Sequence, residues 1–254
     1  MKIITNYKSP NFTGSQSIRE VKFIILHYTE MLFEEALEKL RDKNSSVSSH
    51  YLIHKNGDIY SLVDDNNIAW HAGKSFWGGA EKLNDSSIGI EIDNLGNELF
   101  TEKQMDSCIE LCRVLQKKYN LASHNILGHS DIAVDRKWDP GIFFDWNLLQ
   151  KNKIGIEFKT SSDLEKNEII FTKGDSGEEV LSLQKQLSKL GYKIDLTGIF
   201  DEQTNCVIRA FQAHFVQESI HEKGGIEYFH NLNSVFEWDQ NSKIILDKIT
   251  TCLK

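Results

Sequence analysis

The sequence is poor in cysteine, and this scarcity limits the fold classes open to it. Its four cysteines, Cys108, Cys112, Cys206 and Cys252, include no Cys-x-x-Cys pair. So few cysteines in a chain of 254 residues argue against a disulfide framework. Cys108 and Cys112 stand four residues apart in a segment with helical spacing, and we expect all four to be reduced, structural thiols.

Positive charge is also scarce. The chain has 29 Lys and Arg residues against 37 Asp and Glu residues, which gives a formal net charge of -8. Because no basic block offsets this excess, the composition argues against nucleic acid as the main partner.

Long apolar runs are absent. No stretch approaches the roughly 18 apolar residues of a transmembrane helix, so we expect no membrane span. The first eight residues, MKIITNYK, contain neither the apolar core nor the cleavage site of a secretory signal peptide. This predicts a cytoplasmic protein, and the alternative is a protein of the periplasm or cell envelope whose leader was removed.

The elements that are present predict a mixed central β-sheet flanked by helices, an α/β (α+β) fold. Residues 1–20 are expected to form an irregular arm, and the apolar, β-branched residues 21–29 a buried strand that carries His27 near its end. Asn56-Gly57 separates two short alternating runs and predicts a hairpin. Residues 33–40 and 102–119 have helical spacing, with Thr101 as a cap.

A second strand, residues 87–93, contains an isolated carboxylate. Glu91 is flanked by isoleucines, so its side chain is expected on the opposite face of the strand from theirs. Gly89 shares the face of Glu91 and leaves space beside it. The carboxylate either lies on a solvated sheet face or points into a cleft.

Beyond residue 154 the pattern changes. Residues 155–172 are polar and predict a linker, and residues 173–254 predict a small all-α domain of three helices. The first of these helices is expected within residues 174–192, and the other two would begin near Asp201 and Asp239. We expect His214, His221 and His230 to be surface or packing residues. The first domain would then span residues 1–154.

The segment from Gly128 to Gly141 holds the most suggestive chemistry. His129 and Asp139 stand ten residues apart in a stretch too irregular for one helix. Histidine and aspartate together suit a divalent ion such as zinc, and a catalytic zinc site has three protein ligands and one open position. These residues alone leave the third ligand undetermined.

Residues 20 to about 150 resemble the zinc-dependent N-acetylmuramoyl-L-alanine amidases of the type 2 class. The matching segments, in order, are the strand ending in His27, residues 49–53, Asn56-Gly57, Trp70-His71-Ala72-Gly73, residues 88–92, residues 128–133 and residues 136–141. The resemblance is strongest to the anhydromuropeptide amidases and their peptidoglycan-bound relatives. Val134 departs from the pattern, because relatives usually have proline there.

The resemblance implies one Zn²⁺ per chain, bound by His27, His129 and Asp139. It implies Glu91 as the catalytic carboxylate and Lys137 as the positive group beside the reacting carbonyl. The residues expected to contact substrate are Trp70, His71, Trp77 and Asn94. His124, Asp131 and Asp135 are not ligand positions in the family.

Residues 173 to about 254 resemble a peptidoglycan-binding helical module, with Asp201 where a second glycine is common. The expected activity is hydrolysis of the amide between the lactyl group of N-acetylmuramic acid, or its 1,6-anhydro form, and L-alanine. The expected partners are peptidoglycan or muropeptide fragments. The alternatives are a non-catalytic peptidoglycan-recognition protein on the same fold and a structural zinc protein. The sequence leaves the oligomeric state and the choice between fragment and polymer open.

Overall fold

The computed structural model describes residues 2–14, 19–158 and 168–252, and these residues form two compact units. The first unit comprises Met1–Ser75, Glu81–His129 and Asp139–Ile156, and the second comprises Phe76–Ala80, Ser130–Trp138 and Glu157–Lys254. Two short pieces of the predicted first domain therefore belong to the same unit as the C-terminal residues. Half of the predicted linker, residues 159–167, lies outside the described residues.

The first unit is built on a six-stranded sheet. Its strands, in spatial order, are β1 (Ile3–Ile4), β5 (Ile59–Ser61), β4 (Tyr51–Ile53), β9 (Ser87–Ile92), β3 (Phe23–Tyr28) and β10 (Ile126–Gly128). The β4–β5 hairpin is antiparallel and the other pairs are parallel. The sheet is thus mixed, as predicted, and its central strands are buried because helices cover it.

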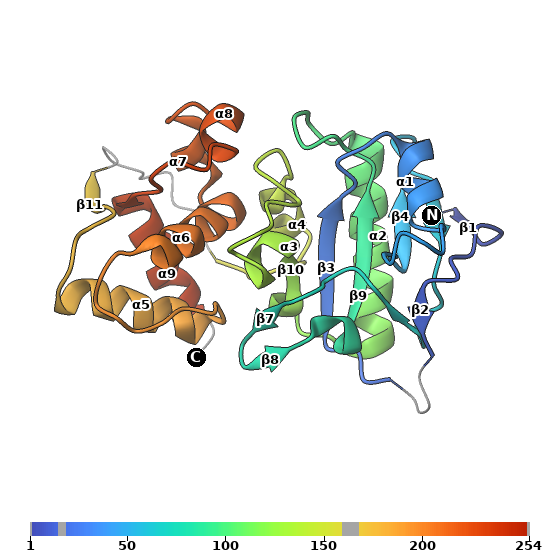
Figure 1. Cartoon of the computed structure of the whole chain (residues 1–254), viewed down its shortest axis with the longest axis horizontal. Helices are drawn as coiled ribbons and strands as arrows, with labels where there is room; N and C mark the ends of the chain where they lie inside the picture. The colour runs from blue at the N-terminus through green and yellow to red at the C-terminus, as the bar shows by residue number, and fades with distance from the viewer. Residues whose placement is uncertain (1, 15–18, 159–167, 253–254) are drawn as a thin grey trace. The chain divides into compact units, whose positions relative to one another are not determined.

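Two helices pack on opposite faces of this sheet (Figure 1). The helix α2 (Glu102–Tyr119) covers the face that carries Ile90 and Ile92, whereas α1 (Phe33–Lys39) packs near Leu52 on the other face. Because side chains alternate along a strand, Glu91 and His27 lie on the face opposite to α2. The candidate site is therefore on the α1 face of the sheet.

The ends of α2 are fixed by local chemistry, and the Thr101 cap is the one that the sequence predicted. Thr101 and Gln104 form a reciprocal capping box at the N-terminus, in which the Thr101 hydroxyl accepts from the Gln104 backbone N–H. Asn120 ends the helix in the left-handed region, with φ at 52°, a conformation that asparagine tolerates better than most residues.

The other elements that precede residue 157 are short. They are β2 (Phe12–Thr13), β6 (Ile68–Ala69), β7 (Phe76–Trp77), β8 (Ala80–Glu81), the 3₁₀ turns Leu83–Ser86 and Ser123–Asn125, α3 (His129–Ile132) and α4 (Trp146–Lys151). Of these, β7 and most of α3 belong to the second unit. Strand β2 pairs with β6, so the N-terminal arm is attached to the loop that precedes His71. Cys108 and Cys112 are buried free thiols in α2, as expected.

The second unit is mainly helical, as predicted. Its elements are α5 (Glu178–Leu190), α6 (Glu202–Phe215), α7 (Gln217–His221), α8 (Ile226–Phe229), α9 (Gln240–Cys252) and the strand pair β11 (Ile169–Phe171) and β12 (Trp238–Asp239). The three longer helices begin near the predicted positions, and α7 and α8 are additional short turns. Within the part of the chain that the structure describes, no helix is both long and apolar enough to cross a membrane.

Candidate metal centre and active site

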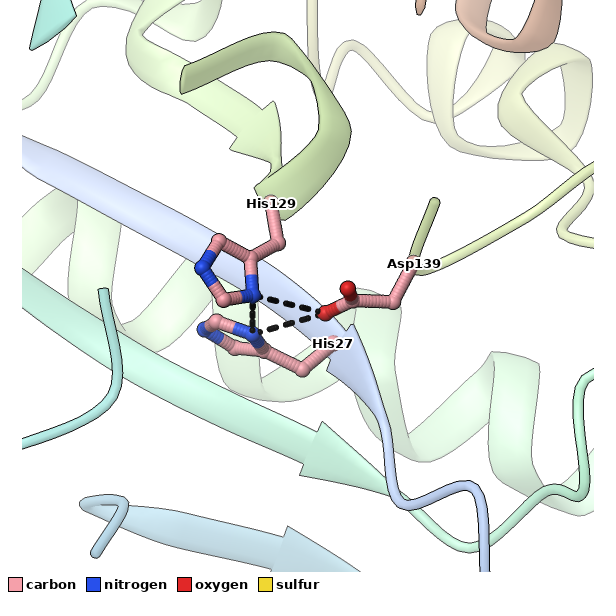
Figure 2. Close-up of side chains that lie close together, drawn as sticks. All are labelled: His27, His129 and Asp139. Atoms are coloured by element: carbon pink, nitrogen blue, oxygen red, sulfur yellow. Dashed lines mark hydrogen bonds and ion pairs between the residues drawn. The ribbon is translucent and has the colours of Figure 1, made fainter. Parts of the chain in front are cut away.

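Three side chains from distant parts of the sequence meet at one point in the first unit (Figure 2). The Nδ1 atom of His27 lies 2.9 Å from Nδ1 of His129 and 2.9 Å from Oδ2 of Asp139. Nδ1 of His129 lies 3.0 Å from the same carboxylate oxygen. The three residues are only 1%, 3% and 6% exposed. The structure thus brings together the three residues that the resemblance implied as ligands.

The parallel register of the sheet explains why the two histidines meet. His27 lies near the carboxyl end of β3, and β10 pairs with β3 so that Gly128 lies opposite Leu26. The residue that follows each of these in the chain is a histidine, so the pairing brings His27 and His129 together at the carboxyl end of the two strands. His129 also begins α3, and Asp139 reaches the site from the loop that follows.

A chain of hydrogen bonds assigns the proton of His27. The Ser87 hydroxyl donates to the Leu83 carbonyl, at 2.6 Å, so its oxygen accepts from Nε2–H of His71, at 3.1 Å. Nδ1 of His71 is then an acceptor, 3.0 Å from Nε2 of His27. In a neutral His27 the proton is therefore on Nε2, and Nδ1 presents a lone pair to the site.

The pKa of His71 supports this assignment. Burial, together with the neighbouring imidazole of His27, lowers the pKa of His71 well below its ordinary value, so the ring is neutral and can accept through Nδ1. Gly89 makes room for this ring, because a Cβ at position 89 would lie 2.4 Å from Cγ of His71. The space beside Glu91 that the sequence suggested is thus occupied by His71.

The other two ligand atoms are also acceptors. Nε2 of His129 lies 3.3 Å from the Ala72 carbonyl, which can only accept, so Nδ1 of a neutral His129 is bare. Burial alone would raise the pKa of Asp139, but the positive charge of a protonated His129, with hydrogen bonds from protonated His129 and His27, outweighs it and holds that pKa well below its usual range. Asp139 is therefore an anion.

This donor set fits a divalent cation. Two imidazole lone pairs and one carboxylate oxygen converge with no proton assigned between them, and their spacing lets all three contact one ion at about 2 Å. The relay through His71 and Ser87 is the kind of outer contact that orients ligating imidazoles. The residues present therefore fit a bound zinc ion, with two nitrogen ligands and one oxygen ligand.

Glu91 lies on the strand next to His27. In the parallel β3–β9 pair the two residues are direct register partners, so their side chains leave the sheet on the same face. Glu91 also pairs with Leu52 of β4, on its other side. The β-sheet thus places a carboxylate beside the candidate metal site, as the functional interpretation of Glu91 requires.

Two of the predicted site residues belong to the second unit. Lys137 is half-buried in the segment between His129 and Asp139, and its backbone N–H donates to the Ala133 carbonyl. Trp77 is buried, and its ring packs edge-on against Tyr192, with ring centroids 4.9 Å apart. The roles of Lys137 and Trp77 toward a substrate are still predictions.

The remaining predicted contacts are in the first unit. Trp70 is half-buried, and its indole N–H donates to the Thr13 hydroxyl at 3.0 Å. Asn94 is buried in a turn, where its side chain accepts from Gly96 N–H and donates to the Glu98 carbonyl. A substrate contact by Trp70 or Asn94 also stays a prediction.

Sequence reasoning missed the contacts that surround the ligands. It treated His71 as a substrate contact, without seeing its hydrogen bond to His27, and it assigned His214 no specific partner. The structure pairs Nδ1 of His214 with the carboxylate of Asp131 at 2.7 Å, within the second unit. Local periodicity carries no signal for such long-range pairs. The group of residues that could hold a metal ion, searched for among the described residues, does not include His124, Asp131 or Asp135.

Comparisons with known families agree with the site. The model of the N-acetylmuramoyl-L-alanine amidase family matches residues 17–142, and that of a putative peptidoglycan binding domain matches residues 176–217. The chain is 34% identical over 218 residues to N-acetylmuramoyl-L-alanine amidase AmiD of Escherichia coli, covering 77% of this chain and 75% of that protein. It is 35% identical over 158 residues to 1,6-anhydro-N-acetylmuramyl-L-alanine amidase AmpD of Haemophilus influenzae, covering 55% of this chain and 86% of the relative.

Solved structures show the same likeness over most of the chain. The complex of Escherichia coli AmiD with anhydro-N-acetylmuramic acid-L-Ala-D-gamma-Glu-L-Lys has a TM-score of 0.74 at 30% identity, covering 94% of this chain and 92% of that one. AmpDH3 of Pseudomonas aeruginosa with anhydromuramic pentapeptide has a TM-score of 0.73 at 27% identity, covering 94% of both chains. With the family model, the fold and both relatives in agreement, the chain belongs to the N-acetylmuramoyl-L-alanine amidase family.

Proposed function

We propose that this protein hydrolyses the amide bond between the lactyl group of N-acetylmuramic acid, or of its 1,6-anhydro form, and the L-alanine of the stem peptide. The convergence of His27, His129 and Asp139 carries this proposal. A non-catalytic recognition protein has no need of a complete ligand set. The names of the relatives support the same substrate class.

We propose zinc as the metal, held by Nδ1 of His27, Nδ1 of His129 and a carboxylate oxygen of Asp139. A zinc ion, when bound, would supply Lewis acidity toward water and the scissile carbonyl. The protein's own part is to turn both imidazoles so that Nδ1 faces the site. The hydrogen bonds from His27 to His71 and from His129 to the Ala72 carbonyl do this.

Glu91 is proposed as the general base and acid. Its carboxylate takes a proton from the attacking water as the water oxygen bonds to the carbonyl carbon, and it then gives that proton to the amine of L-alanine as the C–N bond breaks. The products are the lactyl carboxylate and a free stem peptide. Lys137 is proposed to stabilise the negative charge on the carbonyl oxygen, a contribution of about 3 kcal/mol for one donor.

Trp70, which keeps part of its ring exposed, is the strongest of the four candidates for a substrate contact. His71 and Asn94 are buried and hydrogen-bonded to other residues of the first unit, so we propose that they support the site and do not contact substrate. Trp77 is buried against Tyr192 in the second unit, which makes it a weaker candidate than Trp70. The C-terminal module is proposed to bind peptidoglycan, on the strength of its family match over residues 176–217.

The test is mass spectrometry after incubation with two substrates, a soluble 1,6-anhydromuramyl peptide and purified peptidoglycan. Wild type, chelated wild type and Glu91→Gln are compared, with Glu102→Gln as the matched control, since Glu102 is an exposed carboxylate at the start of α2 on the far face of the sheet. We expect free peptides beginning with L-alanine from wild type and the control, and a loss of about 10²–10⁴-fold for Glu91→Gln with zinc retained.

The substrate that is cleaved faster distinguishes a fragment-recycling enzyme from one that acts on the polymer. Intact substrates in every arm, with zinc confirmed bound to wild type, would overturn the proposed activity. That result would leave peptidoglycan recognition as the function.

A further inference from the structure

The segment that joins the second and third ligands is held by the C-terminal helices. Residues 130–138 follow His129 and precede Asp139, and they belong to the second compact unit. Within this segment Asp131 is only 1% exposed. Its carboxylate accepts two short hydrogen bonds, from the Tyr192 hydroxyl and from Nδ1 of His214, both at 2.7 Å.

Arg209 makes a second connection to the same segment. Its guanidinium donates to the Val134 carbonyl and lies over the ring of Trp138, 4.5 Å from the ring centroid. Arg209 is itself buried, and a buried guanidinium is costly unless it is paired in this way. Trp138 is the residue immediately before Asp139, so this contact reaches the chain next to the third ligand.

All three contacting residues lie in the part of the chain that matches the peptidoglycan-binding family. Tyr192 follows α5, and Arg209 and His214 are on α6, within residues 176–217. They use the interior of the module, since Tyr192 and His214 are also buried. Binding of glycan at the module's surface would not require these buried polar groups. They contact residues 130–138, which lie within the part of the chain that matches the amidase family.

The buried carboxylate of Asp131 depends on its hydrogen-bond donors for its stability. A carboxylate buried this completely costs several kcal/mol unless donors satisfy it, and here both donors come from the helical module. The pairing therefore fixes the segment in one position relative to the helices. A ligand held by a loosely positioned segment gives a weaker metal site, because metal affinity depends on the contacts behind the ligands by factors of about 10–100.

We infer that Tyr192, His214 and Arg209 are positioning residues for the metal centre: by holding residues 130–138 they fix the chain that delivers Asp139 and carries Lys137. The C-terminal module then has a structural role, which is to fix the conformation of residues 130–138, in addition to any binding of peptidoglycan. This inference rests on the proposed function, since it presupposes a metal ion at His27, His129 and Asp139.

The experiment compares Tyr192→Phe with Tyr228→Phe in the full-length protein. Each variant removes one hydroxyl from the second unit, but the Tyr228 hydroxyl donates to the Val235 carbonyl, away from residues 130–138. Two quantities are measured: the rate of zinc transfer to a chromogenic chelator, and kcat and KM on a soluble anhydromuramyl peptide that needs no polymer binding. Thermal unfolding of the zinc-free proteins reports stability separately.

We expect Tyr192→Phe to release zinc about 10–100-fold faster and to lower kcat with little change in KM, whereas Tyr228→Phe leaves zinc release and kcat as in wild type. If Tyr192→Phe changes zinc release only slightly, a second pair of variants, His214→Leu and His214→Asn, tests the other hydrogen bond to Asp131. The asparagine amide can still donate near the position of Nδ1, so it should restore most of the zinc retention that leucine loses.

Unchanged zinc release and kcat in both Tyr192→Phe and His214→Leu would overturn the inference, as would equal changes in Tyr228→Phe. A wild-type protein that retains zinc but cleaves nothing would overturn the proposed activity alone, because zinc release still reports on positioning. A wild-type protein that binds no zinc would overturn both.

Discussion

The Nδ1 atoms of His27 and His129 lie 2.9 Å apart, and when both rings are neutral the partners of their Nε2 atoms leave neither Nδ1 with a proton. Two lone pairs at this distance repel each other, and the Asp139 carboxylate adds a negative charge. A cation at the centre would convert this repulsion into attraction. A proton or a metal cation shared among the three groups would therefore stabilise the arrangement.

The first prediction is that zinc stabilises the protein measurably. Removal of the metal with dipicolinate should lower Tm, and addition of zinc at about 1,000 times its Kd should restore about 4 kcal/mol. Magnesium should not substitute, because it prefers oxygen ligands to two imidazoles. Differential scanning calorimetry makes the measurement, and a Tm that is indifferent to chelation would contradict the metal site.

The second prediction concerns the relay behind His27. Ser87→Ala removes the acceptor that fixes the His71 tautomer, so zinc affinity should fall by about 10–100-fold while the ligands stay in place. Ser107→Ala is a matched control, since the Ser107 hydroxyl also donates to a backbone carbonyl, that of Gly57 at 2.7 Å, but has no contact with the relay. Equal zinc affinities in the two variants, measured by competition, would refute the relay.

The third prediction concerns the close approach of Gly89 to His71. Gly89→Ala places a Cβ about where the imidazole lies, 2.4 Å from its Cγ, so the ring or the strand must shift. We expect a loss of about 1–3 kcal/mol in the free energy of unfolding, as for an overpacked core, together with weaker zinc binding. Urea denaturation and metal competition measure the two effects.

Gly14→Ala is the control for this change. A Cβ at Gly14 would meet nothing within 4 Å, and its φ does not lie in the left-handed region. Its effect on stability should be below about 1 kcal/mol, and stabilising if the unfolded chain loses entropy. If Gly89→Ala were as harmless as Gly14→Ala, the fit between Gly89 and His71 would be looser than the distances indicate.

The fourth prediction is a dependence of stability on pH through His50. Burial, and next the positive charge of Arg19, lower the pKa of His50 to about 3, although Asp65 opposes the shift. Its neutral ring accepts from the Gly89 backbone N–H through Nδ1 and lies 3.1 Å from the Asn67 carbonyl through Nε2. Protonation would break the first of these bonds.

The sign of this effect follows from the lowered pKa. Above about pH 6.5 the ring is neutral in both the folded and the unfolded chain. Between that pH and about 3 the unfolded chain binds a proton that the folded chain does not, so stability falls as the pH falls. His50→Gln should make the decline shallower by up to one proton. Urea denaturation from pH 7 to pH 4, with chelator present in every sample, measures the slopes, and identical slopes would contradict the prediction.

Much of the fold could be predicted from the sequence because its signals are local. Thr101 and Asn120 specify the ends of α2 by their own side chains and backbone preferences. Asn56-Gly57 specifies the β4–β5 hairpin, in which Gly57 adopts a φ of 87°. The apolar residues of α5 and α6 recur every three to four positions, and this spacing predicts a helix in each segment. In each case the information lies within a few residues.

The metal ligands were identified differently. The strand ending in His27 and the motif from His129 to Asp139 were assigned as ligands through resemblance to a family, since the residue types alone left the third ligand open. The structure then supplied the physical reason, which is the parallel pairing of β3 with β10 that brings the two histidines together.

The residues of this sequence determined which segments are helices and strands, and which side chains can bind a metal. Only the tertiary structure decided what surrounds those side chains: that His71 supports His27, that Gly89 yields its space to His71, and that Asp131 is paired with Tyr192 and His214. These contacts join residues 18 to 83 positions apart. They depend on strand register and helix packing, which no local pattern encodes, because a one-residue shift of a strand would turn each side chain to the other face.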